Sequence, residues 1–324
     1  MRQGESGRRN PSSRVRCPRP FTAVALALAV VLVSALSACR PAPAPQKKPA
    51  AGTASSASAA LKQSLTFGAS TETSDTIIYL GDTQADESTG QVVFGSLLAK
   101  ATARDLIVLG GDLVNDPQDP AEWKAFARQF PAPVDPDRQV AVVPGNHTPD
   151  PPALALFAKQ APATIRMAQT EVVLLDSNLL GSLDDDQIAR NQAAFKQALA
   201  QQGNRALILV MHHPLFVLDG NPKDVTRAQT MMKNYGQFFK QADLILCGHE
   251  HMYARYTDPD TGIIQVMGNA SGKGYEPSNP QMPGLEKLYT ATPVTTRITI
   301  SSQTLTLQTN SAQGAPLDAA TITR

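Results

Sequence analysis

The residues best suited to chemistry in this sequence are its histidines, because all of them stand in short polar motifs. The chain contains five His. A lone histidine is most often structural, whereas five that share one setting, beside Asp and Asn, indicate a common site. The motifs are Gly81-Asp82-Thr83-Gln84, Gly111-Asp112, Gly145-Asn146-His147, His212-His213 and Gly248-His249-Glu250-His251.

Imidazole, carboxylate and amide groups in this combination favour divalent ions such as Mn, Fe and Zn. Two ions held close together need a shared carboxylate to offset their repulsion, and they acidify a bound water enough to supply hydroxide at neutral pH. Such a site suits phosphate-ester hydrolysis, because both ions can stabilise the attacking and leaving oxygens. The motifs therefore predict two divalent metal ions as cofactors and a small phosphate ester as substrate.

Each motif follows a short apolar run that we expect to be a buried strand. The runs are rich in Val, Ile and Leu without alternation, which is typical of strands covered on both faces. Because ligands bind beyond the carboxyl ends of such strands, this arrangement gathers distant residues at one place. The expected strands, including two that no motif follows, lie at 76–80, 106–109, 140–143, 172–175, 207–211, 244–247 and 263–267.

Helical patterns separate several of these strands. Asp119 is a plausible N-cap with Pro120 at the first helical position, and Gly203 directly follows another helix that has an acidic start. Residues 293–310 alternate apolar and polar side chains and predict antiparallel strands. Strands alternating with helices, followed by a strand-rich end, predict an α/β layered fold. The helices are expected over 91–102, 120–130, 184–202 and 226–241.

Taken together, the motifs resemble the calcineurin-like metallophosphoesterase superfamily in order and spacing, from residue 75 to about 275. The segments 175–178, 248–255 and 268–272 are similar to its purple-acid-phosphatase-like branch. The resemblance implies a two-sheet sandwich flanked by helices and hydrolysis of phosphate esters. Monoesters are favoured, with phosphodiester or nucleotide pyrophosphate hydrolysis as the alternative. A weakened metal-binding lipoprotein that serves as a binding module is the alternative of another class.

The resemblance also implies which residues hold the metals. Asp82 and His251 would bind the first ion and Asp112 would bridge both. Asn146, with two histidines, would bind the second ion. The expected metal ligands are Asp82, Gln84, Asp112, Asn146, His212, His249 and His251.

Four further side chains are expected near the substrate. His147 would donate a proton to the leaving oxygen or steady the phosphoryl group. His213 would contact the substrate or support the metal ligands from behind, because adjacent strand residues point to opposite faces. Tyr253 and Arg255 would line the pocket and bind substrate, or else brace their loop.

Three positions depart from the family's pattern. Gln84 stands where His is usual; its amide oxygen would favour Mn, Mg or Fe over a Zn pair, or it would hydrogen-bond beside the metal. Thr148 stands where an acidic residue is common, which would weaken His147 as a general acid. Asn115 stands where the coloured purple acid phosphatases have Tyr, so we expect no charge-transfer colour.

Residues 1–39 have the pattern of an export signal. A basic stretch is followed by an apolar run over 21–38, and small residues precede Cys39. This order resembles a bacterial lipobox, in which the Cys39 thiol is acylated and becomes the new N-terminus. The alternative is an uncleaved membrane anchor, since the run is near the lower length limit for a span. Both interpretations predict an extracytoplasmic protein anchored in a membrane of the bacterial cell envelope.

The remaining chain divides into a linker and one domain. Residues 40–60 are rich in Pro, Ala and Ser and lack the large apolar groups that folding requires, so we expect a linker over 40–65 and the metallophosphoesterase domain at 66–324. Residues 1–39 hold six Arg and one Glu, so the charge would change from +1 to about −4 on processing. A mildly acidic chain has no general attraction for nucleic acid, and we expect no nucleic-acid partner. Of the three Cys, Cys247 alone would remain in the domain, where we expect it to be a buried strand residue.

Overall fold

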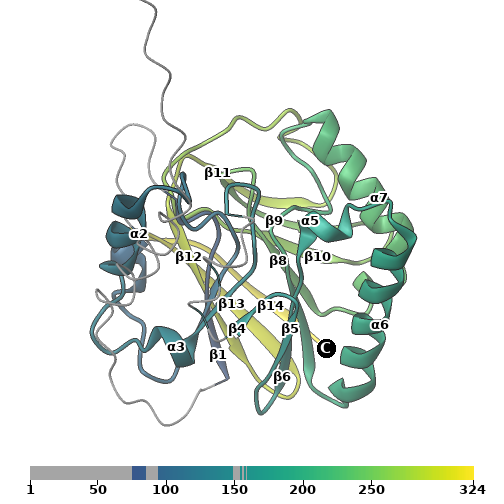
Figure 1. Cartoon of the computed structure of the whole chain (residues 1–324), viewed down its shortest axis with the longest axis horizontal. Helices are drawn as coiled ribbons and strands as arrows, with labels where there is room; N and C mark the ends of the chain where they lie inside the picture. Colours follow the sequence, from purple (N-terminus) through teal and green to yellow (C-terminus); the bar gives the residue numbers. More distant parts are fainter. Residues whose placement is uncertain (1–74, 85–93, 149–153, 155–156, 158) are drawn as a thin grey trace, which may run out of the picture. The chain divides into compact units, whose positions relative to one another are not determined.

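Two β-sheets lie face to face in the computed structural model, with helices on both outer faces (Figure 1). The structure describes residues 75–84, 94–148, 154, 157 and 159–324. Within this part of the chain each sheet has seven strands. The α/β two-sheet sandwich expected from the sequence is therefore confirmed.

The first sheet has the strand order β14-β13-β12-β1-β2-β3-β4. Its strands are β1 (Thr76–Leu80), β2 (Leu106–Leu109), β3 (Val140–Val142), β4 (Lys159–Gln160), β12 (Val294–Ile300), β13 (Thr304–Ser311) and β14 (Pro316–Thr323). The second sheet has the order β11-β9-β10-β8-β7-β6-β5. Its strands are β5 (Ala163–Arg166), β6 (Thr170–Leu174), β7 (Ala206–Val210), β8 (Leu244–Cys247), β9 (Met252–Thr257), β10 (Ile264–Met267) and β11 (Leu285–Thr290).

The strands that precede the polar motifs run parallel within each sheet. In the first sheet β1 pairs with β2 and β2 with β3 in parallel. In the second sheet β7 pairs with β8 in the same way. All the motifs therefore begin at carboxyl ends, and each sheet presents its own set along one edge.

Three apolar layers hold the sheets and helices together. Ile77, Val108 and Ile208 belong to the layer between the two sheets, which buries one face of each. Trp123 packs in the layer between the first sheet and its helices. Phe195 packs in the layer between the second sheet and its helices. Because both faces of the central strands are covered, their sequences show continuous apolar runs rather than alternation.

The helices follow local sequence signals with small shifts. The Asp119 side chain accepts a hydrogen bond from Ala121 N at 2.8 Å and caps the first long helix, as expected. The Asn221 side chain caps another helix, which begins four residues before the expected start at 226. Pro222 follows that cap at a position where a missing N–H costs nothing. The helices are η1 (Phe94–Leu98), α2 (Pro120–Ala127), α3 (Pro136–Gln139), α5 (Ser177–Leu180), α6 (Asp185–Gln202) and α7 (Pro222–Phe239).

Two of the secondary-structure elements differ from those expected from the sequence. The helix expected over 91–102 is, in its described part, only the short 3₁₀ helix η1, which packs Phe94 and Leu98 against the first sheet. The strand-rich tail expected over 293–310 extends further, since β14 pairs with β13 up to residue 323. Residues 1–39 and 40–65, with Cys39, lie outside the described part. Among the described residues no helix combines the length and apolar character that a membrane span requires.

Candidate metal centre

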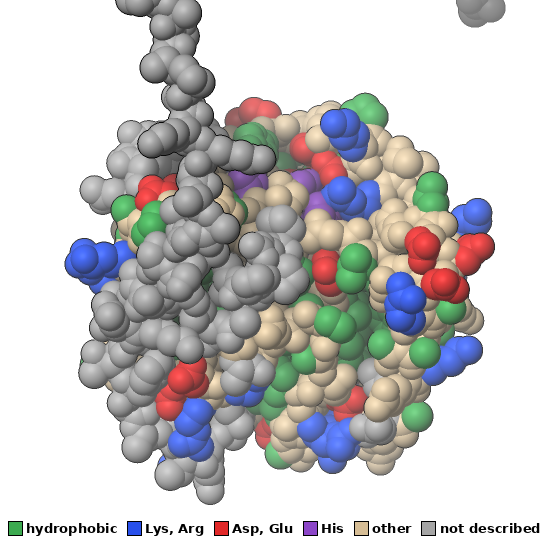
Figure 2. All heavy atoms as spheres, in the orientation of Figure 1, with side chains coloured by type: hydrophobic (Ala, Val, Ile, Leu, Met, Phe, Trp, Pro, Cys, Tyr) green, Lys and Arg blue, Asp and Glu red, His purple; other side chains and the backbone are tan. Residues whose placement is uncertain are grey.

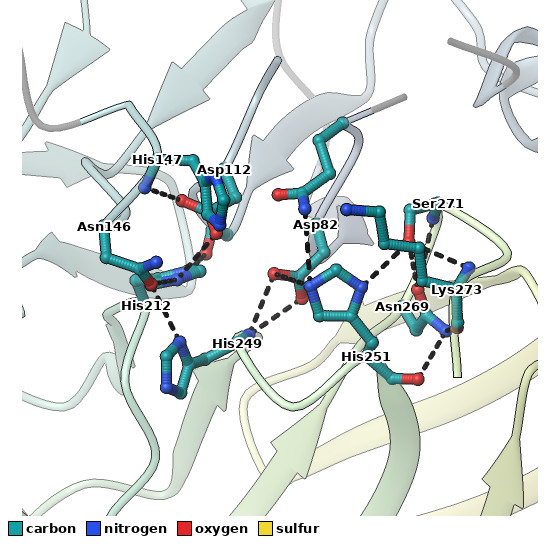
Figure 3. Close-up of polar contacts among 12 residues, drawn as sticks. Asp82, Asp112, Asn146, His147, His212, His249, His251, Asn269, Ser271 and Lys273 are labelled. Atoms are coloured by element: carbon teal, nitrogen blue, oxygen red, sulfur yellow. Dashed lines mark hydrogen bonds and ion pairs between the residues drawn. The ribbon is translucent and has the colours of Figure 1, made fainter. Parts of the chain in front are cut away.

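The polar motifs of the two sheets meet at one edge of the sandwich, where histidine side chains are visible at the surface (Figure 2). Direct hydrogen bonds join the sheets there. Asp82 follows β1 and His249 follows β8. Both carboxylate oxygens of Asp82 accept hydrogen bonds from His249 N, at 3.0 and 2.8 Å. His212 follows β7 and Gly110 follows β2, and His212 Nδ1 lies 2.9 Å from Gly110 O. Residues more than 100 positions apart therefore share one site (Figure 3).

Four of these side chains form what we call the second ligand group: Asp112, Asn146, His212 and His249. Asn146 Oδ1 lies 3.0 Å from His212 Nε2 and 2.9 Å from His249 Nδ1. His212 Nε2 is 3.3 Å from Asp112 Oδ2. Oxygen and nitrogen donors of the kind that bind Mn, Fe or Zn thus converge within hydrogen-bond distance.

The other nitrogen of each ring has the partner that a metal ligand needs. His212 Nδ1 faces the carbonyl oxygen of Gly110, so Nδ1 must donate there and Nε2 points toward Asp112. His249 Nε2 lies 3.1 Å from Asp224 Oδ2, so Nδ1 points toward Asn146. Carbonyl and carboxylate partners of this kind orient metal-binding imidazoles and strengthen them as ligands. The second ligand group therefore fits a divalent cation.

The first ligand group consists of Asp82, Gln84 and His251, beside the same Asp112. His251 Nε2 lies 3.9 Å from Asp82 Oδ1 and 3.5 Å from the amide of Gln84. His251 Nδ1 is 3.3 Å from Ser271 Oγ. The expected residues are thus close together, but a further side chain, Lys273, reaches the Gln84 amide.

The backbone of the site is held in an unusual conformation. Most described non-glycine residues with positive φ are expected ligands, and each such residue costs about 1–3 kcal/mol unless its surroundings hold it. They are Asp82 (φ 48°), Asp112 (φ 45°), His249 (φ 80°) and His251 (φ 50°), with Ala291 (φ 50°) as the remaining one. Strain concentrated at the ligands indicates that the fold has to position them.

Two glycines of the motifs make room for carboxylates. A Cβ added at Gly145 would overlap the Asp112 carboxylate, and a Cβ added at Gly248 would overlap that of Asp82. The glycines are therefore explained by close approach to the ligands, since their φ angles are not positive.

Burial and neighbouring charges perturb the ionisation of this site. Burial raises the pKa of Asp82 to about 7. Burial disfavours charge on Asp112 as well, but the charge and hydrogen bond of His212 outweigh it and hold the pKa of Asp112 well below its usual range. Burial also disfavours a charged His212 ring, yet Asp112 and Asp82 raise the pKa of His212 to about 9. Burial lowers the pKa of His251 to about 3, with a contribution from Lys273.

Sequence comparison now identifies the family. A family model described as calcineurin-like phosphoesterase matches residues 75–253, more than half of the chain. The chain belongs to the calcineurin-like phosphoesterase family. A comparison with curated protein sequences gives no significant match.

Two solved structures match this chain at low sequence identity. GAP50, described as the anchor in the inner membrane complex of Plasmodium, matches with a TM-score of 0.54 and 15% identity, over 76% of this chain and 88% of that chain. A dimetal phosphatase from Danio rerio matches with a TM-score of 0.48 and 13% identity, over 76% and 98% of the two chains. At this identity the likeness to GAP50 supports the fold alone.

His147 of this calcineurin-like family member lines the pocket next to the expected ligands. Its backbone N donates to Asp112 Oδ1 at 2.8 Å, and its Nδ1 lies 3.2 Å from Asn115 O. The carbonyl of Asn115 thus orients the ring in place of an acidic residue at 148. Thr148 is instead buried, where its Oγ accepts from Leu113 N.

Three expected substrate residues are not among those that line this pocket. His213 is buried, with Nδ1 2.9 Å from Ser177 Oγ, and its Nε2 is among the described buried atoms without a hydrogen-bond partner. Burial lowers the pKa of His213 strongly. Tyr253 Oη and Arg255 Nε both bind Asp318 on β14, at 2.7 and 2.8 Å. Of the alternatives left open, the geometry therefore supports the position behind the ligands for His213 and the bracing role for Tyr253 and Arg255.

Several residues at the site were not predicted. Asp224 orients His249, and Ser177 Oγ accepts from both His212 N and His213 N, at 3.2 and 3.0 Å. The Glu250 carboxylate accepts a hydrogen bond from Leu218 N in the segment before α7, and burial raises the pKa of Glu250 to about 8. Ser177 and Glu250 each had a signal, as part of a family-like segment, whereas Asp224 had none. The pocket lining is Asp112, Asn146, His147, Asp219, Asn221, Asp224, His249, His251 and Tyr275.

Proposed function

We propose that this calcineurin-like phosphoesterase hydrolyses phosphate esters in a metal-dependent reaction, with monoesters preferred. The observation that supports this proposal is the second ligand group, in which Asn146 Oδ1 lies about equally near two imidazole nitrogens at 3.0 and 2.9 Å. Both rings have outer partners, which are expected of metal ligands rather than of buried structural histidines. When bound, the cation supplies Lewis-acid polarisation of the phosphoryl group and an acidified water as nucleophile.

The chain's own residues supply proton transfer and orientation. Because a backbone carbonyl can only accept, Nδ1 of His147 donates to Asn115 O, and the proton that His147 exchanges with a leaving oxygen is the one on Nε2. Asp112 holds the His147 backbone through its Oδ1 at 2.8 Å, which places this ring beside the ligands. Asp224 and Gly110 O keep the two ligand rings turned toward the second ligand group.

An assay of the full-length chain in detergent tests this function. The substrates are p-nitrophenyl phosphate and its bis ester, with and without Mn²⁺. We expect Mn²⁺-dependent turnover that falls at least about 100-fold in Asp112→Asn, because the substitution removes a charged ligand. Asp260→Asn is the matched control, since Asp260 is exposed in the turn between β9 and β10 and the substitution should leave turnover unchanged.

The competing function is a binding module that keeps the fold and a metal but does not turn over substrate. The ammonium of Lys273 beside Gln84 is the observation that favours it, because a cation-binding position is altered. A folded, metal-loaded protein that is inert across monoesters, diesters and pyrophosphates would support this alternative and contradict the enzyme.

We also propose that the protein acts outside the cytoplasmic membrane as a lipoprotein acylated at Cys39. The support is sequence alone: a basic stretch, an apolar run and small residues before the cysteine. Cys39→Ser should prevent acylation and shift the protein out of the membrane fraction or block its processing. Unchanged processing and membrane association in that variant would favour an uncleaved anchor.

A further inference from the structure

A positively charged side chain reaches into the first ligand group. Lys273 is only 8% exposed, and its Nζ lies 3.2 Å from Asn115 Oδ1. Figure 3 shows Lys273 on the His251 side of the site, away from Asn146 and the rest of the second ligand group. The ammonium is therefore near the position at which the family pattern expects a first metal ion.

Gln84 connects this ammonium to the carboxylate that was expected to bridge two ions. The amide satisfies both of its neighbours when its oxygen accepts from Lys273 Nζ at 2.9 Å and its nitrogen donates to Asp112 Oδ2 at 3.1 Å. In this orientation the oxygen that Gln84 would offer to a metal already accepts a hydrogen bond from an ammonium group.

His251 presents an acceptor on the same side. Ser271 Oγ donates to Asn269 Oδ1 at 2.9 Å, so His251 Nδ1 acts as the donor to Ser271 at 3.3 Å. A neutral ring that donates through Nδ1 accepts through Nε2, which faces the Asp82 carboxylate and, in this orientation of the amide, the Gln84 oxygen. The first ligand group thus offers a carboxylate and a lone pair to some cation.

An ammonium group can be that cation, but it cannot be a ligand. It has three donors and no acceptor, and it repels a divalent ion placed beside it. The second ligand group differs, because its inward-facing atoms include the Asn146 amide oxygen and the nitrogens of two oriented rings. The two halves of the site therefore differ in the atoms that they can offer to a metal ion.

We propose that this chain binds a single divalent cation, at the second ligand group, and that the ammonium of Lys273 takes the place of a second ion in the first group. The inference rests on the proposed function. It replaces the two ions expected from the sequence with one ion and one lysine. The chemical departure of Gln84 from the usual His is then explained, since an amide oxygen accepts from an ammonium group and a metal-binding imidazole does not.

Metal stoichiometry tests this proposal without reference to turnover. The metal-free full-length chain is titrated with Mn²⁺, and bound metal is counted by calorimetry and elemental analysis. We expect one equivalent in the wild type, with the electron paramagnetic resonance signal of an isolated Mn²⁺ ion. Lys273→Met removes the charge at similar length and should bind a second equivalent with a spin-coupled signal. Lys233→Met, on the exposed side of α7, is the matched control and should bind one.

A second variant tests the proposal if Lys273→Met does not fold. Gln84→His restores the ring of the family pattern but keeps the ammonium, so it should still bind one equivalent. Two equivalents in the wild type or in Gln84→His would overturn the inference, as would a folded Lys273→Met that binds only one. Failure of the wild type to bind any Mn²⁺ would instead overturn the proposed function, and this inference with it.

Discussion

Removal of the Asp224 carboxylate tests whether the second ligand group is a metal site. Asp224 Oδ2 lies 3.1 Å from His249 Nε2, and its side chain is only 7% exposed. Burial works against its charge, but the hydrogen bond and charge of His249 outweigh this and lower the pKa of Asp224. The residue is therefore an anion that orients the ring and strengthens Nδ1 as a ligand.

The size of the effect follows from this geometry. A charge-assisted contact behind a metal-binding imidazole typically contributes 10- to 100-fold to metal affinity. Asp224→Asn keeps the shape of the side chain and removes the charge, so we expect Mn²⁺ binding to weaken by about 10- to 100-fold, or about 1.4–2.7 kcal/mol. Because Asp224 is also the acidic residue in the first turn of α7, a loss of about 0.3–1 kcal/mol in stability should accompany it.

The assay is calorimetric titration of the metal-free protein with Mn²⁺, together with the thermal midpoint of each variant. Asp219→Asn is the matched control, because Asp219 lines the same pocket and loses the same charge, while its Oδ1 accepts from Asn221 N. The control should weaken binding by less than about threefold, by long-range electrostatics alone. Equal losses in the two variants, or no loss in Asp224→Asn, would refute an orienting role for Asp224.

Two further predictions concern ionisation and packing. Because the pKa of metal-free His212 is raised to about 9, ligation must displace a proton, and Mn²⁺ affinity should rise about tenfold per pH unit from pH 6 to 8.5. Calorimetry in buffers of different ionisation enthalpy should show about one proton released, and a pH-independent affinity would contradict the assignment. Phe126 is fully buried with its ring 5.1 Å from that of Phe94, so Phe126→Ala should cost about 3–5 kcal/mol in urea unfolding. Leu183→Ala, at a residue 80% exposed, should cost less than about 0.5 kcal/mol, and similar losses in both would contradict the core assignment.

The strand framework and most of the site could be read from local sequence. Apolar runs such as 106–109 predicted strands because both of their faces are covered, and the structure has β2 at those residues. The placement of Asp82 and Asp112 after two such runs predicted that they would lie close together, since the carboxyl ends of neighbouring parallel strands share one edge of a sheet. Local chemistry also predicted the helix cap at Asp119, because the capping hydrogen bond joins residues two positions apart.

The tertiary structure decided the contacts that join distant segments. The sequence indicates only that Asp224 is an acidic residue at the start of a helix, and the packing of α7 beside β8 brings it to His249. Arg255 stands in a family-like motif, yet pairing of the tail strands brings Asp318 to it, and this buried charge pair holds the side chain away from the pocket. In the sequence Lys273 has the pattern of an ordinary loop lysine, and only the course of the chain after β10 places it beside Gln84. Each of these outcomes depends on an interaction between residues far apart in the chain, which no local pattern of residue types records.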